Sequence, residues 1–485
     1  MAHHTLLADR PEHHTGHPLA HRGRVVHSFG GAHRLGWGSA LVLAAIFATL
    51  ALQRHAQLLT TGYDLGIFDQ GVRAYSEGKL PSSLLKGIDY SLLGDHFSPI
   101  LATLAPLYLV FNGPQVLLVA QAVLIAVGVV PLTIWAARSL GPKTAIVVAI
   151  SYGLAGGLAH AVAFDFHEIA CAVPLLSFSL TALGNRRLRA AALWAAPLVL
   201  VKEDLGLTVA AIGALIAVLA GRSNRPVRRL GIATVMFGLA ATVIESYALI
   251  PLFNPGGQNS YTGQIGLDGA MYQLMTLMFN NLKVETVILL LLPTAFIALR
   301  SPIVLLVIPT LAWRFLSDNP GYWGNAFHYD AVLVPIVSAA FVDALVRLRR
   351  RGGGSARHRL VLLVSLVTTT ALLTASPLAQ LFSPALWQPS EHVTAARSVL
   401  AKIPDGASVA ASNSLAAQLT GRAEVSLFGI LPIETNRPEF IVADTSIPHQ
   451  FPLDAGALAR LVDSAEGSGY RMVDAADGVV LLARQ

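Results

Sequence analysis

Long apolar runs recur along most of this chain and constrain its fold more than any other feature. A helix needs about 20 apolar residues to cross the hydrocarbon core of a membrane. Eight runs predict strong spans, at residues 36–53, 115–137, 143–163, 168–183, 205–221, 229–251, 331–347 and 360–382. Shorter runs at 189–202, 284–299 and 301–316 are expected to cross as slightly short helices. Only 13% of the residues are charged, about half the share in soluble domains. The sequence therefore predicts an all-α polytopic membrane protein with about 11 transmembrane helices.

Clusters of arginine predict which ends of the spans face the cytoplasm, because cytoplasmic loops retain Lys and Arg. These clusters are Arg22/Arg24/Arg34, Arg138/Lys143, Arg186/Arg187/Arg189, Arg222/Arg225/Arg228/Arg229 and Arg347–Arg351 with Arg357/Arg359. Placing all of them inside gives a plasma-membrane protein with a cytoplasmic N-terminus and an outer C-terminus. The segment 97–112, which Pro99 and Pro106 interrupt, is then an interfacial or re-entrant helix of the first outer loop, residues 54–114.

The two ends of the chain differ from the transmembrane region, residues 36–383. Residues 1–35 hold eight of the 16 histidines; we expect a disordered cytoplasmic leader, although such a tract could bind metal. Residues 384–485 have ordinary polarity. Strand-like runs (407–412, 424–429, 440–444, 478–484) alternate there with helix-like runs (414–421, 453–465). This pattern predicts a small α/β domain, which the span count places outside the cell.

Acids and histidines gather in the outer loops once the arginines fix the topology. Ionisable groups at membrane depth are costly, and they are usually functional or paired. We therefore expect an outward-facing polar cavity. The single cysteine, Cys171, excludes a disulfide framework and a thiolate metal site. The P-loop and GxGxxG motifs are absent, and we expect no nucleotide, haem or zinc cofactor and no nucleic-acid partner.

Two carboxylates follow the first span directly. Asp64 and Asp69 lie in the sequence YDLGIFDQ, where a partly desolvated carboxylate could deprotonate a hydroxyl group. Alternatively, Asp64 caps a short helix and Asp69 is simply solvated. Both remain candidates for catalysis.

Two basic residues at the outer face are candidates for binding a phosphate. Lys202 interrupts an apolar stretch together with Glu203 and Asp204; the triplet could instead be an exposed hairpin tip. Arg314 lies near the outer end of the run 301–316, where the preference of Lys and Arg for the cytoplasmic side does not explain a basic residue. Its guanidinium could hold a phosphate by two hydrogen bonds, or form a salt bridge to Asp318.

Three mixed clusters complete the candidate site. They are Asp95 with His96, then Asp165 with His167 and Glu168, and finally His328, Tyr329 and Asp330. Oxygen-rich sets with histidine suit a divalent cation such as magnesium or manganese, whereas paired His–carboxylate hydrogen bonds would merely hold loops together. The aromatic side chains near residue 329 could form the interfacial belt or stack on a sugar.

The order of these motifs resembles a known family. YDLGIFDQ, GDHFSPILATLAPLYLVF, FDFHEIACAVPLL, LVLVKEDLGL, FHYDAVLVP and ASVAASNSLAAQLTGR occur in succession. Together they are similar to a prokaryotic membrane-protein family catalogued as a domain of unknown function and grouped with the GT-C glycosyltransferase superfamily. The resemblance covers roughly residues 40 to 450.

This resemblance implies a fold and an activity. GT-C enzymes transfer a sugar from a polyprenyl-phosphate carrier to an acceptor on the outer face of the membrane, and their first outer loop carries interfacial helices. An acidic residue of that loop acts as general base or orients the acceptor; Asp64 matches that position best and Asp69 is the substitute. Asp165 and Glu168 match positions that bind metal or acceptor in some members. The resemblance thus implies synthesis of a cell-envelope glycan or glycoconjugate, with inversion because one base suffices.

Two other functions are compatible with the sequence. A transporter or flippase of a lipid-linked or polar solute would show inverted repeats and polar residues in both membrane halves; neither is evident in the sequence. An inactive envelope scaffold would act through the C-terminal domain.

Overall fold

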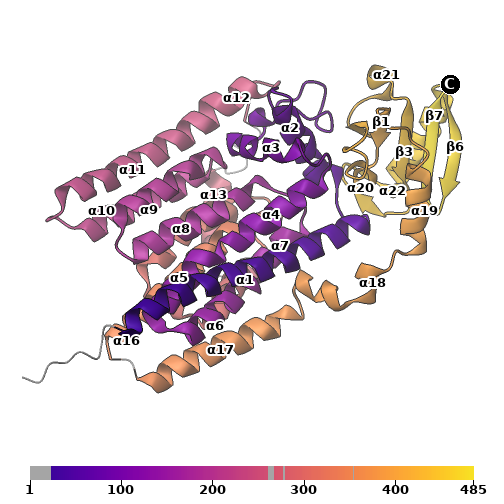
Figure 1. Ribbon diagram of the computed structural model, residues 1–485. Helices are drawn as coiled ribbons and strands as arrows, with labels where there is room; N and C mark the ends of the chain where they lie inside the picture. The colour runs from indigo at the N-terminus through magenta and orange to yellow at the C-terminus, as the bar shows by residue number, and fades with distance from the viewer. Residues whose placement is uncertain (1–22, 260–266, 277–278, 353) are drawn as a thin grey trace, which may run out of the picture.

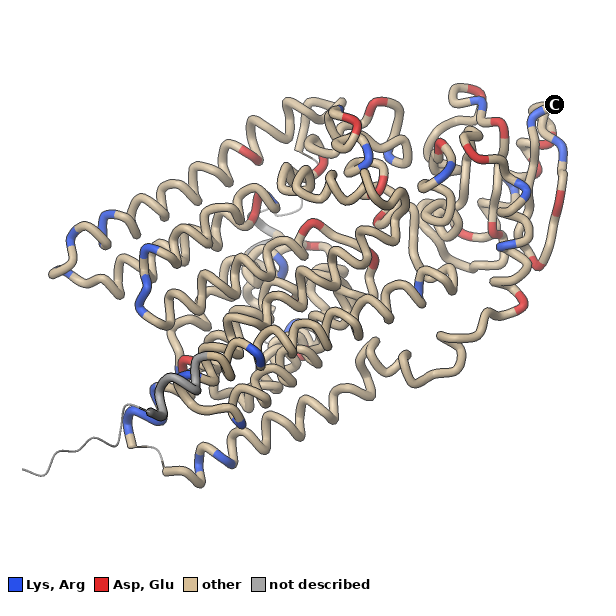
Figure 2. Tube along the Cα trace, in the orientation of Figure 1, with Lys and Arg blue, Asp and Glu red and all other residues tan. Residues whose placement is uncertain are grey.

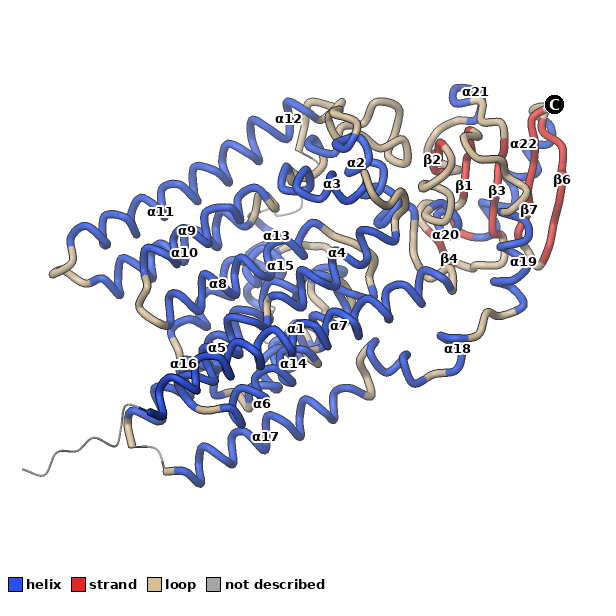
Figure 3. Tube along the Cα trace, in the orientation of Figure 1, coloured by secondary structure: helices blue, strands red, loops and turns tan. Residues whose placement is uncertain are grey.

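The computed structural model describes residues 23–259, 267–276, 279–352 and 354–485. Long helices lie side by side in a bundle, and a sheet domain caps one end of it (Figure 1). Figure 3 shows that the helices fill the bundle, whereas the strands cluster in the C-terminal domain. The helices of the bundle are α1 (Gly23–Ala56), α4 (Gln115–Val127), α5 (Val129–Leu140), α6 (Pro142–Gly153), α7 (Gly156–Ala163), α8 (Ala172–Gly184), α9 (Leu188–Ala195), α10 (Leu205–Ala220), α11 (Arg225–Ile244), α12 (Ile250–Phe253), α13 (Leu267–Met275), α14 (Asn281–Leu291), α15 (Ile308–Leu316), α16 (Leu333–Arg350) and α17 (Ser355–Leu373).

Most of the predicted spans are present as apolar helices. Five helices of the described chain are long and apolar enough to cross a membrane, and six if α6 and α7, which are bent by 42°, count as one. Shorter apolar helices occupy four further predicted spans, at Glu168–Gly184, Leu188–Leu200, Leu205–Ala220 and Pro302–Leu316. The central helix α16 is buried along nearly its whole length, whereas α11 and α17 expose most of their apolar side chains at the periphery, where lipid would contact them.

Three predicted boundaries differ from the structure. The run 284–299 is not one helix, because Ala295 and Phe296 adopt left-handed backbone angles (φ +49° and +57°) that turn the chain back. The span 360–382 ends earlier, at Leu373, and Pro377 then begins a separate 3-10 turn, consistent with the helix-breaking effect of proline. Residues 1–22 of the leader lie outside the described residues, but the part from Gly23 onward already belongs to α1.

The segment 97–112 forms two short pieces, η3 (Pro99–Leu104) and α3 (Ala105–Tyr108). Each piece has a proline in its first turn. Ten residues of helix reach at most about 20 Å, which is too short for a hydrocarbon core of about 30 Å. Leu109, Val110 and Phe111 are exposed just after it, as expected for a segment lying at the membrane interface.

Glycines bring α10 and α11 into backbone contact. A Cβ on Gly238 would lie 2.3 Å from the carbonyl oxygen of Gly206, and one on Gly213 would lie 2.8 Å from that of Gly231. Small residues allow membrane helices to approach this closely. The packing fixes α11, whose end forms one wall of the candidate site.

Charge is separated along the bundle (Figure 2). Basic residues gather at the end that carries the α10–α11 turn and the C-terminus of α16, while acidic residues gather toward the sheet domain. The acidic groups thus lie at the end where the candidate site forms.

The C-terminal domain contains a five-stranded sheet of order β2-β1-β3-β7-β6. Its strands are β1 (Ser408–Ala411), β2 (Glu424–Leu427), β3 (Phe440–Asp444), β6 (Tyr470–Ala476) and β7 (Val479–Arg484). The pairs β1–β2 and β1–β3 are parallel, and the other two pairs are antiparallel. Four strands were predicted; β6 was not, because it is an edge strand with mostly exposed side chains. The remaining elements of this region are α18 (Pro384–Trp387), α19 (Glu391–Leu400), α20 (Asn413–Ala416), α21 (Ile433–Asn436), α22 (Ala455–Gly467), β4 (His449–Gln450) and β5 (Leu453–Asp454).

Candidate active site

A cavity of about 500 Å³ lies at the end of the bundle next to the sheet domain. Ten predicted site residues line it: Asp64, Asp95, His96, His167, Glu168, Lys202, Glu203, Asp204, His328 and Tyr329. They come from five separate segments of the chain, so only the fold brings them together. The polar cavity expected from the sequence is thus present at the acidic end of the bundle, and its outward orientation stays a prediction.

Asp64 lies in the π-helical turn η1 (Gly62–Gly66), directly after the first long helix. Its side chain is 30% exposed and borders the cavity. The Nε2 atom of His167 lies 3.4 Å from Asp64 Oδ1. The Thr61 hydroxyl lies 3.1 Å from Asp64 Oδ2 and 2.9 Å from Asp165 Oδ2, and its single proton can go to either carboxylate. Asp64 is therefore an accessible carboxylate held between a histidine and a hydroxyl.

Asp165 stabilises this turn through hydrogen bonds with Thr61. Its Oδ2 atom also accepts the backbone N–H of Thr61 at 2.8 Å, and its backbone is left-handed (φ +56°). Burial, together with the nearby charge of Asp64, raises the pKa of Asp165 to about 7. Asp165 does not line the cavity, so its contact with the site passes through Thr61.

Because of this shift, the stability of the protein is expected to depend on pH through Asp165. The folded protein binds the Asp165 proton more tightly than the unfolded chain, whose carboxyl titrates near 3.8. Stability should therefore fall as the pH rises from about 4 to 7 and stay low above that. Asp165→Asn, which keeps an acceptor oxygen and tolerates the left-handed backbone, should remove this part of the pH dependence. Thermal unfolding midpoints from pH 4 to 8 for both proteins measure it; identical curves would contradict the assignment.

Two lysines of the cavity are each paired with a carboxylate. Lys202 Nζ lies 3.0 Å from Glu168 Oε1, and Lys86 Nζ lies 2.5 Å from Asp95 Oδ2. The triplet that contains Lys202 is thus not an exposed hairpin tip: it faces the cavity. Each carboxylate keeps its lysine charged at a largely desolvated site. An anionic ligand in the cavity can then bind the same ammonium group.

The acids beside Lys202 have partners of their own. Glu203 Oε1 is 2.8 Å from His96 Nδ1, so Glu203 pairs with the histidine of another cavity segment. Asp204 Oδ2 accepts the indole N–H of Trp313 at 2.9 Å, and burial raises the pKa of Asp204 to about 6. Glu245 is buried in the π-helical turn that follows α11, and none of the described residues hydrogen-bonds its Oε2 atom.

Aromatic rings form another wall. Trp313, Tyr322 and Tyr329 contact one another edge to face, with centroids 5.2 to 6.0 Å apart. The rings of His167 and His328 stack at 3.7 Å, and neither ring nitrogen of His328 finds a partner among the described residues. This wall presents flat apolar faces beside hydrogen-bonding groups, which is a surface suited to a sugar ring.

Four predicted site residues lie outside the cavity lining. Besides Asp165, Asp69 is fully buried and joins α2 (Ile67–Ser76) to α3, bonding Arg73 at 2.8 Å and the Tyr108 hydroxyl at 2.7 Å. The solvated Asp69 offered as an alternative is therefore wrong. A catalytic role for Asp69 stays a prediction, and the buried position of Asp69 outside the cavity lining does not favour it.

Arg314 and Asp330 are paired with each other. Arg314 is completely buried and donates to Asp330 Oδ1 at 2.5 Å and to the carbonyl oxygens of Tyr322 and Gly324 at 2.8 and 2.7 Å. The salt bridge to Asp318 considered from the sequence is not the one formed. Arg314 thus fixes the loop behind the aromatic wall, and the phosphate role predicted for it stays without support.

The divalent cation considered from the sequence stays a prediction. No group of three or more His, Cys, Asp or Glu side chains in the described part of the chain is arranged to hold one. The acids that could ligate it are engaged with lysine, histidine or indole groups.

Several cavity residues were missed from the sequence. They are Tyr63, Lys86, Trp313 and Tyr247. Lys86 could have been identified, because a lysine in a loop predicted to lie outside is contrary to the preference of Lys and Arg for cytoplasmic loops. The aromatic residues carried none, since belt residues of membrane proteins look the same in sequence.

The helical bundle with a polar cavity at one end defines a fold that is known from solved structures. ArnT from Cupriavidus metallidurans superposes with a TM-score of 0.58 at 15% sequence identity, covering 94% of this chain and 98% of that chain. The protein therefore shares the fold of that ArnT structure. Residues 54–481 match the family described as "Predicted membrane protein (DUF2079)", and the chain belongs to that family. No curated protein sequence matches it.

More distant structures come from Archaeoglobus fulgidus. One is an oligosaccharyltransferase tethered with an acceptor peptide, with a TM-score of 0.41, 11% identity, and coverage of 93% of this chain and 74% of that chain. The other is AglB in complex with an inhibitory peptide and a dolichol-phosphate, with a TM-score of 0.37, 12% identity, and coverage of 92% and 74%.

Proposed function

We propose that this protein is a membrane glycosyltransferase. It transfers a sugar from a polyprenyl-phosphate donor to an acceptor at the outer face of the plasma membrane, in the synthesis of a cell-envelope glycan or glycoconjugate. Eleven spans would place the basic end of the bundle in the cytoplasm and the cavity, with the C-terminal domain, outside. The separation of charge along the bundle supports this orientation.

One observation carries the proposal: an accessible carboxylate and two lysines share a cavity that also reaches the periphery of the bundle. Asp64, Lys86 and Lys202 line the cavity together with Tyr247. Tyr247 is 71% exposed in the π-helical turn (Glu245–Leu249) that follows α11, where lipid would lie. A donor could therefore keep its isoprenoid chain in the membrane while its phosphate and sugar occupy the polar cavity.

The proposed chemistry needs one base and a stabilised leaving group. Asp64 removes the proton of the acceptor hydroxyl as its oxygen attacks the anomeric carbon. The bond between that carbon and the phosphate oxygen breaks, and polyprenyl phosphate leaves with the electron pair. Lys202 and Lys86 stabilise the charge that develops on the phosphate. A single displacement of this kind inverts the configuration at the anomeric carbon.

Sugar transfer by the purified protein tests the proposal. The full chain in lipid nanodiscs would be incubated with a panel of labelled polyprenyl-phosphate sugars, and transfer or release of the sugar measured. Activity that requires Asp64 supports the proposal. If no donor yields transfer or release, and Asp64→Asn leaves the cellular phenotype intact, the proposal fails.

Removing the charge of Lys202 is expected to weaken donor binding by about 10- to 100-fold, since a hydrogen bond to a charged group contributes about 1.5–3 kcal/mol. Lys202→Met alone would leave Glu168 buried without its cation, so the informative variant is Lys202→Met with Glu168→Gln. Lys79→Met, in the same outer loop as Lys86 but exposed, is the control. The dissociation constant for polyprenyl phosphate in nanodiscs measures the effect, and unchanged binding would remove Lys202 from the phosphate site.

A further inference from the structure

The C-terminal domain contacts the turn that carries Asp64. The amide oxygen of Asn413, at the start of α20, accepts the backbone N–H of Tyr63 at 2.7 Å. Ala416, one turn further, packs against Gly62 so closely that a Cβ on Gly62 would lie 2.4 Å from Ala416 Cβ. Both contacts fall on the residues immediately before Asp64, and both come from a part of the chain about 350 residues away.

A third contact reaches the cavity through the Tyr63 ring. Phe451, which follows β4, packs on Tyr63 with ring centroids 4.4 Å apart. Lys86 Nζ lies 5.3 Å from the centroid of the same ring, close enough for a cation–π interaction. Tyr63 thus links the C-terminal domain to a cation of the cavity, while its backbone links the domain to Asp64.

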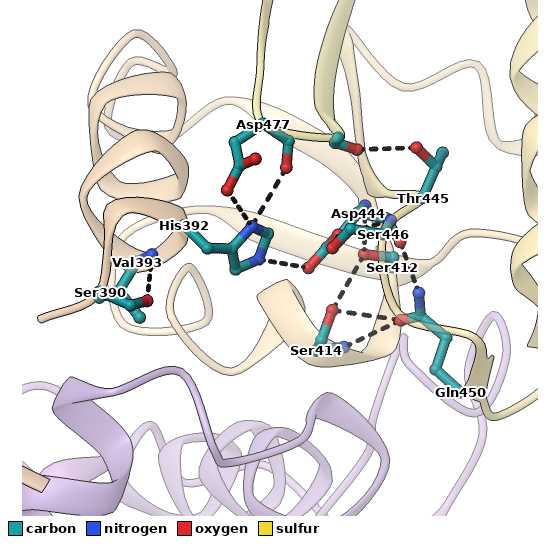
Figure 4. A network of polar contacts seen from close by, with 11 residues as sticks. Ser390, His392, Val393, Ser412, Ser414, Asp444, Thr445, Ser446, Gln450 and Asp477 are labelled. Atoms are coloured by element: carbon teal, nitrogen blue, oxygen red, sulfur yellow. Dashed lines mark hydrogen bonds and ion pairs between the residues drawn. The ribbon is translucent and has the colours of Figure 1, made fainter. Parts of the chain in front are cut away.

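The domain residues that make these contacts are themselves fixed by a polar network (Figure 4). Gln450 Oε1 accepts the hydroxyl of Ser414 at 3.1 Å, and Gln450 Nε2 donates to the carbonyl oxygen of Asp444 at 2.7 Å. The Asp444 backbone N–H donates to the Ser412 hydroxyl at 3.1 Å. Ser412 and Ser414 flank Asn413, and Gln450 precedes Phe451, so one network holds both contact residues against the membrane domain.

Apolar packing joins the same surfaces. Ile67, Leu85 and Leu92 of the first outer loop belong to one buried cluster with Leu415 and Leu419 of the C-terminal domain. A buried, shared core makes this interface a fixed one, in contrast to the polar interfaces that let domains move.

We propose that Asn413 and Phe451 are positioning residues that hold Asp64 and Lys86 in place over the cavity, so that the C-terminal domain is a working part of the active site. This inference rests on the proposed function for its consequence in catalysis.

Variants on the two sides of the interface test the contact in the full-length protein. Asn413→Ala removes the acceptor for the Tyr63 N–H, and Asn413→Asp restores one. Gly62→Ala introduces the clash with Ala416, and Ala416→Gly in the same chain relieves it. Asn436→Ala is the control, because the Asn436 side chain bonds only to Ser426 within the domain among the hydrogen bonds described.

Two readouts do not require activity. Hydrogen exchange of the Tyr63 amide is expected to become about fivefold faster in Asn413→Ala, the value of one net hydrogen bond, and to be normal in Asn413→Asp. Labelling of carboxyl groups with a carbodiimide should change at Asp64 in Asn413→Ala and Gly62→Ala, and return to the wild-type rate when Ala416→Gly is added. Labelling of Glu77, which is exposed and pairs with Lys79 in the same loop, should stay constant.

The third readout is sugar transfer. We expect kcat to fall about tenfold in Asn413→Ala and Gly62→Ala with the KM for the donor unchanged, since misplacing a catalytic group lowers the rate of the chemical step. Unchanged exchange and labelling would overturn the proposal, as would altered labelling with a normal kcat. If the wild-type protein transfers no sugar, the proposed function fails, while labelling of Asp64 still decides whether the C-terminal domain positions it.

Discussion

Replacing Asp64 by Asn is expected to lower the rate of sugar transfer by about 10²- to 10⁴-fold, the usual contribution of a general base. Asn is nearly isosteric and can still accept from the Thr61 hydroxyl, but it cannot take the acceptor proton. Because Asp64 is partly exposed and has no lysine or arginine partner among the described residues, its loss should leave the fold and donor binding intact. Single-turnover transfer in nanodiscs measures the effect.

A matched control separates this result from a general effect of removing charge. Glu77 lies in the same outer loop, is exposed and pairs only with Lys79 among the described residues. Glu77→Gln should therefore transfer sugar at the wild-type rate. Equal activity of Asp64→Asn and Glu77→Gln would show that Asp64 is not the base, and Asp69 would then be the next carboxylate to test.

Replacing Arg314 by Met is expected to destabilise the protein by about 3–5 kcal/mol, the usual cost of breaking a buried ion pair from one side. The change leaves Asp330 charged and buried, and it leaves the carbonyl oxygens of Tyr322 and Gly324 without their donor. Arg314→Met combined with Asp330→Asn should recover part of the loss, because the uncompensated charge is gone. Thermal unfolding in nanodiscs measures these differences.

The same variants decide between two roles for Arg314. Arg300→Met, an exposed arginine at the end of a 3-10 turn, is the control and should unfold like the wild type. If Arg314→Met were as stable as the control and lost only donor binding, the phosphate role predicted from the sequence would be correct and the structural role wrong.

The sequence predicted the class of fold because membrane insertion imposes local rules. Apolar runs of about 20 residues and arginine-rich ends depend only on neighbours in the chain, so ten of the eleven predicted spans appear as apolar helices. The same rules placed the polar residues around Asp64, Glu168 and Lys202 together at one end of the predicted spans. The interruption of 284–299 carried a local signal that the prediction did not use, because Pro293 lies in this run and α14 ends at Leu291.

The roles of individual charges could not be predicted in the same way. The residues themselves do not distinguish Asp64 from Asp69, which lie five residues apart in one motif, and only the family resemblance ranks Asp64 first. In the structure, Asp69 is fully buried against Arg73 and Tyr108, while Asp64 faces the cavity. Arg314 and Lys202 were likewise equal candidates, and only Lys202 borders the cavity.

The sequence by itself determined that this protein crosses a membrane, which end of the bundle is basic, and which few polar residues lie at the other end. The tertiary structure decided which of those residues meet. That decision depends on contacts between segments far apart in the chain, such as Asn413 against Tyr63 and Trp313 against Asp204. Hydropathy is a sum over neighbouring residues, whereas a site is a set of distances between distant ones, and only folding fixes those distances.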